Sequence, residues 1–110
     1  MLTVNILGTR YTIKEHSVED DKYLEECDGY CDSTSKTICI SKVKPTWDAD
    51  NVSEYRKKIM RHEIIHAYMN ESGLQECFEH KRWGHDEIAV DWFAIQFPKI
   101  LATYKELGCI

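Results

Sequence analysis

The stretch from Asn51 to Gly73 constrains the fold most strongly, because it carries helix signals at both ends. Asn51, with Glu54 three residues later, is typical of a capping box and predicts a helix that begins near Val52. Gly73 predicts a left-handed end just after Ser72. These signals predict one long helix over residues 52–72, against which the rest of the chain must pack.

One stripe of this helix follows the three-and-four spacing of a buried face. The stripe contains two histidines and four apolar or aromatic residues: Val52, Tyr55, Ile59, His62, His66 and Met69. We therefore expect both histidines to point into the core.

The motif His62-Glu63-Ile64-Ile65-His66 lies within this helix. Residues four apart share a helical face, so His62 and His66 can direct imidazole nitrogens at one metal ion. Glu63 faces the same opening, where it could take a proton from a water molecule and return it to a leaving amine. The alternative is two core histidines that are hydrogen-bonded to backbone or carboxylate groups. A third ligand distinguishes the two, because a catalytic zinc takes three protein ligands.

The candidates for this third ligand lie downstream, at His80, His85 and Glu87. A histidine at position 72 would indicate a metzincin, but that position is Ser72. Glu87 is favoured because it opens an apolar helix that can lie against the first, and Asp91 follows four residues later on the same face. Asp91 can accept a hydrogen bond from a zinc-binding histidine and so fix its tautomer. We expect one Zn²⁺ per chain, held by His62, His66 and Glu87.

These residues together resemble the gluzincins, and the run Glu87 to Ala94 followed by Pro98 resembles the second signature of the ImmA/IrrE metallopeptidases, which are often phage-borne. Ile65 stands where that family typically has glycine. The resemblance implies a zincin-like fold and a zinc endopeptidase, which agrees with Glu63 as general base, and the cysteine pattern favours a cytoplasmic protein. It implies a protein or peptide substrate, such as a repressor of a mobile element. In the family the strand before the helix, here Thr37 to Ser41, offers an edge to the peptide.

Other interpretations remain open. The start of the motif also resembles the SprT-like proteases, in which the third ligand is a histidine. A non-catalytic or latent metal-binding module with the same fold is a further alternative. His85 and Tyr68 are candidates to donate a hydrogen bond to the oxyanion that forms during hydrolysis.

The remaining elements predict a small antiparallel sheet. Residues 3–14 predict a hairpin with the two-residue loop Gly8-Thr9, and residues 30–32 and 37–41 predict a second hairpin with Thr37 to Ser41 half-buried. Residues 16–29 are acidic and favour a solvated connection. The helix that starts near Glu87 is expected to stop at Pro98, and a last helix to run from Lys99 to Leu107. We expect a single α+β domain over residues 1–110.

Composition excludes some function classes. With 110 residues, of which 43% are hydrophobic, the chain can form one core, and its net charge of -5 argues against a nucleic-acid partner. No segment predicts a membrane span or a targeting sequence. The five cysteines contain no C-x-x-C pair, which favours reduced thiols, and Cys27, Cys31 and Cys39 lack the paired spacing of structural zinc sites.

Overall fold

The computed structural model describes residues 2–73 and 87–110, without the side chains of Glu87, Ile88, Val90, Asp91 and Ala94. The described elements are the strands β1 (Leu2–Ile6), β2 (Thr9–His16), β3 (Gly29–Asp32) and β4 (Thr37–Ser41), the 3₁₀ turn η1 (Lys22–Glu25), and the helices α1 (Val52–Glu71) and α3 (Glu87–Glu106). The predicted α+β class is confirmed.

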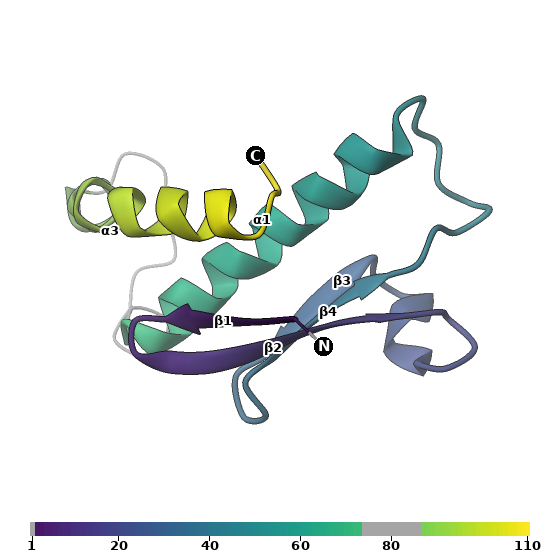
Figure 1. Cartoon of the computed structure of the whole chain (residues 1–110), viewed down its shortest axis with the longest axis horizontal. Coiled ribbons are helices and arrows are strands. Elements are labelled where there is room, and N and C mark those ends of the chain that lie inside the picture. The colour runs from purple at the N-terminus through teal and green to yellow at the C-terminus, as the bar shows by residue number, and fades with distance from the viewer. Residues whose placement is uncertain (1, 74–86) are drawn as a thin grey trace.

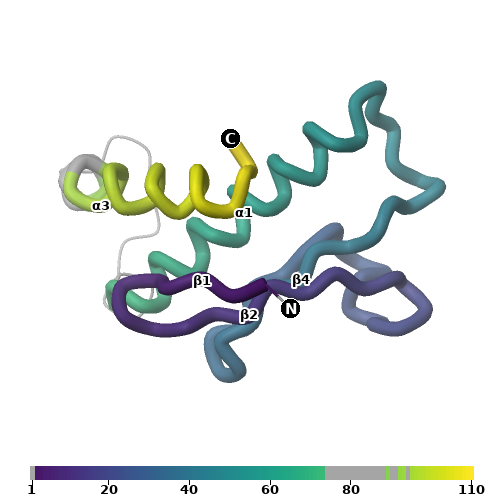
Figure 2. The backbone as a smooth tube through the Cα atoms, in the orientation of Figure 1, coloured from purple at the N-terminus to yellow at the C-terminus, as the bar shows by residue number. Residues whose placement is uncertain are grey.

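The four strands form one mixed sheet in the order β1-β2-β4-β3. Both predicted hairpins are present, because β1 pairs antiparallel with β2, and β3 with β4. The prediction of a purely antiparallel sheet is wrong, since β2 and β4 are parallel, with Thr12 opposite Thr37. After β2 the chain passes through η1, re-enters the sheet as the edge strand β3, and returns as β4 between β3 and β2 (Figure 2).

Both helices lie on one face of this sheet, with α1 crossing it diagonally and α3 beside α1 (Figure 1). Mostly aliphatic and aromatic side chains from the sheet, from both helices and from the end of the chain form the core. They are Val4, Ile6, Tyr11, Ile13, Ile38, Ile40, Ile59, Ile64, Ala67, Tyr68, Ile100, Tyr104 and Cys109. This packing fixes the position of α1 relative to the strands.

All five residues of β4 are buried, so the prediction of a half-buried strand is wrong. Ile38 and Ile40 join the core beneath α1. The alternate residue Cys39 faces away from α1, where its Sγ lies 3.8 Å from Oδ2 of Asp21. The connection before β3 therefore covers the second face, and its Leu24 is fully buried.

The β1–β2 turn lies one residue earlier than predicted. Its loop is Leu7-Gly8, with φ values of 51° and 94°, instead of Gly8-Thr9. Positive φ at both positions is typical of a type I′ turn, which matches the twist of a hairpin. The register places Val4 opposite Tyr11, and burial of these two side chains on one face decides the position of the turn.

The first helix has the ends that its sequence predicts. Oδ1 of Asn51 accepts a hydrogen bond from the backbone N–H of Glu54 at 3.2 Å. Gly73, after the C-cap Ser72, has a φ of 81°. These local signals do not depend on the rest of the fold, which explains why they were sufficient.

The last helix is continuous through Pro98, so the predicted break is wrong. Proline removes one backbone donor and crowds the preceding turn, at a cost of about 3 kcal/mol. Trp92 before Pro98 and Ile100 and Tyr104 after it pack on the hydrophobic core, which holds both halves of α3 in place. Gly108 ends the helix with a φ of 65°, close to the predicted position.

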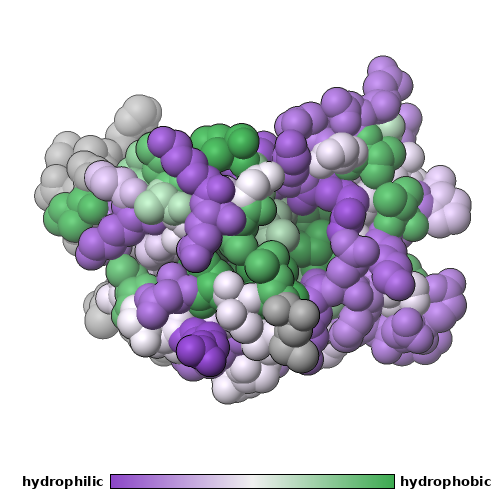
Figure 3. Space-filling view, viewed as in Figure 1, coloured by the Kyte–Doolittle hydropathy of each residue, from purple (hydrophilic) through white to green (hydrophobic). Residues whose placement is uncertain are grey.

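Apolar residues gather on the surface where the end of α3 meets α1, with hydrophilic residues around them (Figure 3). A cleft there is lined by Ile40, Val43, Met60 and Leu107, with Arg56 and Lys57 at its rim. None of the helices in the described ranges combines the length and the apolar content that crossing a bilayer requires.

Candidate metal centre

The two histidines of α1 converge as the motif predicts. Their Nε2 atoms lie 3.2 Å apart, and the ring centroids 4.9 Å apart. Two nitrogens bound to one tetrahedral zinc ion at about 2.0–2.1 Å each would be about 3.3 Å apart. The positions of His62 and His66 therefore fit a shared zinc ion with little rearrangement. Partial burial of the His66 ring, and the positive charge of a protonated His62 beside it, lower the pKa of His66.

Glu63 lies beside these rings and is only 6% exposed. One ligand atom from each of His62, Glu63 and His66 lies within 4.8 Å of the others. Burial raises the pKa of Glu63, and a charge on His62 opposes that shift. A buried carboxylate next to two imidazoles has the character of a proton acceptor.

The helix is rotated relative to the predicted inward stripe. His62 and His66 are exposed, whereas Ile59, Glu63, Ile64, Ala67 and Tyr68 are buried. The prediction that both histidines point into the core is therefore wrong. The pattern was misleading because the buried face includes a charged residue, Glu63, which a hydrophobicity count assigns to the surface.

The histidines face a cleft between α1 and β3 with a volume of about 420 Å³. Its other walls come from Cys27 and β3 on one side and from Asn70 on the helix. An adjoining depression shares Gly29, His62 and Glu63 with it and extends toward Tyr55. The two together form a groove that runs along β3 and passes the candidate centre.

β3 is the strand that borders this groove, and it lies at the edge of the sheet. The resemblance implied that Thr37 to Ser41, which is β4, would offer a free edge. That expectation is wrong, because β4 is paired on both sides, with β2 and with β3. Among the strands that the structure describes, the edge strand beside His62 and His66 is therefore Gly29–Asp32.

Gly29 brings the edge strand close to α1. A Cβ atom at this position would lie 2.7 Å from Cγ2 of Ile59 and 3.0 Å from the carbonyl oxygen of Cys39. Neither neighbour is the free end of a flexible side chain, so the strand would have to move away from the helix. Glycine here sets the width of the groove.

We expect Gly29→Ala to lower the free energy of unfolding by about 1–3 kcal/mol, through overpacking against Ile59. Urea unfolding followed by circular dichroism measures the change. In a double-mutant cycle, Gly29→Ala should cost less in an Ile59→Ala background than in wild type, because the clashing methyl is gone. In an Ile59→Val background the cost should stay the same, since valine retains the branched methyl. Wild-type stability in the single variant would contradict the close approach.

Asp28 anchors the chain just before β3. Its carboxylate accepts hydrogen bonds from Nε1 of Trp47 at 2.9 Å and from the hydroxyl of Tyr55, and forms an ion pair with Nζ of Lys44 at 3.0 Å. Lys44 also donates to the carbonyl of Cys27 at 2.7 Å. One carboxylate thus ties the start of the edge strand to the loop before α1 and to α1 itself.

This anchor predicts acid-labile stability. Burial by itself raises the pKa of Asp28, but the hydrogen bonds from Tyr55, Trp47 and Lys44 outweigh it and hold the pKa below the ordinary 3.8. A lowered folded-state pKa stabilises the fold above the unfolded-state value, and this contribution is lost as the pH falls. The free energy of unfolding should therefore decrease between about pH 5 and pH 3.

Urea unfolding across this pH range checks the prediction. Asp28→Asn should show a smaller decrease than wild type, because asparagine does not titrate. The exposed Asp48→Asn variant is the control and should retain the wild-type decrease. Equal slopes in wild type and Asp28→Asn would contradict the role of Asp28.

Tyr68, a candidate oxyanion donor, has a different role. It is 2% exposed, and its hydroxyl lies 2.6 Å from Oγ1 of Thr103 and 3.1 Å from the carbonyl oxygen of Lys99. Both partners belong to α3, so Tyr68 links the two helices within the core. Its hydroxyl is occupied there and does not serve the cleft.

The other predicted site residues lie before α3 or in its first turns. Glu87 is the first residue of α3, but its side chain and that of Asp91 lie outside the described residues, as do His80 and His85. The helix that carries Glu87 packs against α1 as expected. Nε1 of Trp92 donates to Oγ of Ser72 at 3.0 Å, which places the first half of α3 beside the C-terminal end of α1.

Several residues that line the cleft were not identified from the sequence. Asn70 follows His66 by four residues and shares its helical face, a spacing that could have indicated it. Gly29, Tyr30 and Cys31 reach the cleft through the pairing of β3, which no local pattern reveals.

Comparison of the chain with protein-family models, with curated proteins and with solved structures finds no match. The residues themselves must therefore carry any functional argument.

Proposed function

We propose that this chain is a zinc-dependent endopeptidase of the gluzincin type, similar to the ImmA/IrrE enzymes. One observation carries the proposal: the Nε2 atoms of His62 and His66 converge to 3.2 Å beside a buried Glu63. The groove along β3 adds support, because it gives an extended peptide access to this point.

In this proposal His62, His66 and Glu87 hold one zinc ion. The ion supplies Lewis-acid chemistry, which polarises the scissile carbonyl and acidifies water. Asp91 accepts a hydrogen bond from one of the liganding histidines and fixes its orientation. Glu87 and Asp91 come from their spacing in the sequence and from the resemblance, and the packing of α3 on α1 is consistent with them.

Glu63 does the proton chemistry. Its carboxylate takes a proton from the attacking water and returns that proton to the leaving amine. Burial favours this role, since a desolvated carboxylate is a stronger base than an exposed one. His85 is the remaining candidate for the oxyanion donor, because the hydroxyl of Tyr68 is engaged by Thr103.

The substrate is a protein segment in extended conformation. Among the described strands, β3 forms the edge of the sheet beside the candidate centre, and an extended peptide can add to such an edge through main-chain hydrogen bonds. Main-chain pairing gives affinity with little sequence preference. The resemblance to phage-borne peptidases makes a repressor of a mobile element the expected substrate.

Metal analysis tests the ligand set. The proteins are purified without added metal or chelator. His62→Ala and Glu87→Ala should each contain one zinc equivalent per chain less than wild type. His80→Ala and His85→Ala are the matched controls and should retain it. Full zinc in Glu87→Ala, with loss in either control, would replace the gluzincin assignment by the SprT-like one. Full zinc in His62→Ala would contradict the proposed centre.

A further inference from the structure

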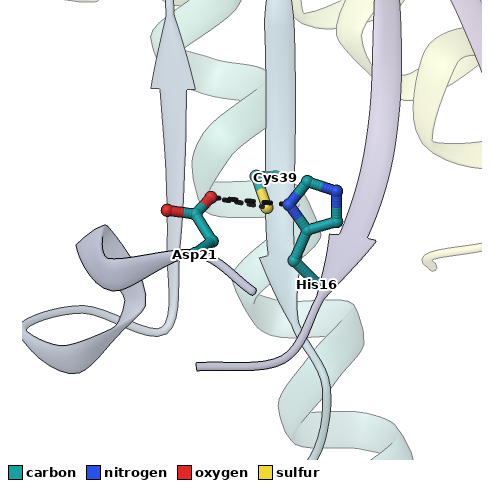
Figure 4. Close-up of side chains that lie close together, drawn as sticks. All are labelled: His16, Asp21 and Cys39. Atoms are coloured by element: carbon teal, nitrogen blue, oxygen red, sulfur yellow. Dashed lines mark hydrogen bonds and ion pairs between the residues drawn. The ribbon is translucent and has the colours of Figure 1, made fainter. Parts of the chain in front are cut away.

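A second group of metal-ligating side chains lies on the face of the sheet that α1 does not cover. It consists of His16 at the end of β2, Asp21 at the N-cap of η1, and Cys39 in the middle of β4 (Figure 4). One ligand atom from each residue lies within 4.8 Å of the other two. Three elements distant in sequence thus direct a nitrogen, an oxygen and a sulfur at one small volume.

The distances match those of a zinc site. Oδ2 of Asp21 lies 3.5 Å from Nδ1 of His16 and 3.8 Å from Sγ of Cys39. In a tetrahedral zinc site, bond lengths of about 2.0–2.1 Å to nitrogen and oxygen and 2.3 Å to sulfur give edges of about 3.3 and 3.5 Å. Movements of a few tenths of an ångström would complete the geometry.

Among the described residues, the Asp21 carboxylate lies at ion-pair distance from Nδ1 of His16, but no hydrogen bond joins the two. This nitrogen is shielded from solvent and makes no hydrogen bond to any described residue. A buried polar atom without a partner costs free energy, so such atoms are rare and point to an unseen ion or water. The Cys39 thiol donates to Oδ2 of Asp21 at 3.8 Å, so the contacts within the cluster are long, as are those between ligand atoms around one metal ion.

The surroundings of Asp21 support a ligand role. Its Oδ1 accepts from the backbone N–H of Tyr23 at 3.1 Å, and the hydroxyl of Tyr30 donates to Oδ2 at 2.5 Å. Hydrogen bonds of this kind orient carboxylates that bind metals. Cys39 is fully buried, and such a thiol has access to a metal only from within the cluster.

We propose that Nδ1 of His16, Oδ2 of Asp21 and Sγ of Cys39 bind a second zinc ion, with solvent water as the fourth ligand. Thiolate and imidazole ligands favour zinc over magnesium or calcium. On binding, the Cys39 S–H bond breaks, an Sγ–Zn bond forms, and the proton passes to solvent. The electron count is unchanged, so no oxidant or reductant is needed.

This zinc links separate elements of the fold. It joins the end of β2 to η1 and β4, and through Asp21 it holds Tyr30 of the edge strand. The site therefore restrains β3 from the face of the sheet opposite α1, whereas the groove lies between β3 and α1. It does not depend on His62 or His66, so it stands even if the chain hydrolyses no peptide.

Cobalt substitution distinguishes this site from the first. The variant His62→Ala/His66→Ala removes the first centre, and the apoprotein is then titrated with Co²⁺ alone. We expect one bound equivalent and a near-ultraviolet thiolate-to-cobalt charge-transfer band. Cys39→Ser in the same background should abolish the band and reduce binding at least tenfold. Cys31→Ser is the matched control on the neighbouring strand and should retain both.

Folding of each variant is checked by circular dichroism. If Cys39→Ser does not fold, His16→Gln is tested instead. His16 is partly exposed, so this substitution should leave the fold intact. It should weaken cobalt binding at least tenfold. Absence of cobalt binding in the folded His62→Ala/His66→Ala protein would overturn the proposal. So would a band that survives in folded Cys39→Ser or His16→Gln, or one that requires Cys31.

Discussion

Replacement of Glu63 by glutamine is expected to lower the rate of peptide hydrolysis by about 10²–10⁴-fold, the usual contribution of a general base. Glutamine has nearly the same shape and can still form hydrogen bonds, but it does not accept the proton of the attacking water. Zinc content should stay at the wild-type value, because the proposed ligands are His62, His66 and Glu87. Cleavage of a quenched fluorescent peptide library, together with metal analysis, measures both quantities.

The control is Glu54→Gln, an exposed glutamate in the first turn of the same helix. It should hydrolyse the library at the wild-type rate. Wild-type activity in Glu63→Gln would show that Glu63 is not the base. Loss of zinc in Glu63→Gln would instead make this residue a ligand and would require another base.

The second large effect concerns stability and comes from Glu71, the last residue of α1. Its carboxylate accepts hydrogen bonds from Oγ1 of Thr9 at 2.9 Å, from the hydroxyl of Tyr11 at 2.8 Å and from Nζ of Lys36 at 2.7 Å. These partners belong to the β1–β2 hairpin and to the turn before β4. The ion pair with Lys36 leads the interactions that lower the pKa of Glu71.

We expect Glu71→Ala to lower the free energy of unfolding by about 3 kcal/mol. Hydrogen bonds to a charged group contribute about 1.5–3 kcal/mol each, and the value is reduced here because Lys36 is partly exposed. The fully buried Tyr11 would also lose its acceptor. A small domain loses about 4–8 °C of Tm per kcal/mol, so this variant should melt about 12–24 °C below wild type.

Glu106→Ala is a matched control, because Glu106 is the last residue of the other long helix and is exposed. Its effect should stay within about 0.5 kcal/mol. Glu71→Gln should be intermediate, since the amide still accepts from Tyr11 but does not pair with the charge of Lys36. Similar stabilities for Glu71→Ala and Glu106→Ala would contradict the triple contact.

The success of the sequence-based predictions depends on how local each signal is. The cap at Asn51, the left-handed Gly73 and the convergence of His62 and His66 all arise within one helix, where spacing alone determines geometry. The two hairpins also formed as predicted. Non-local competition shifted the β1–β2 turn by one residue, because burial of Val4 and Tyr11 on one face set the register.

Other predictions failed where burial or strand order is decided by distant elements. The continuity of α3 through Pro98 depends on packing at both ends of the helix. Glu63 is buried and His62 is exposed because of the side of α1 that packs on β3. Among the described strands, the edge beside the candidate centre is β3 and not β4, because β4 pairs with β2 on its other side.

By itself the sequence determined that this protein has a capped helix with two histidines one turn apart and a glutamate beside them, because helix periodicity places residues i and i+4 on one face. Only the tertiary structure decided which strand borders them and which side of the helix is buried. It also brought His16, Asp21 and Cys39 together from three separate elements. Strand pairing and crossover connections join residues that are far apart in the chain, and no local pattern encodes those distances.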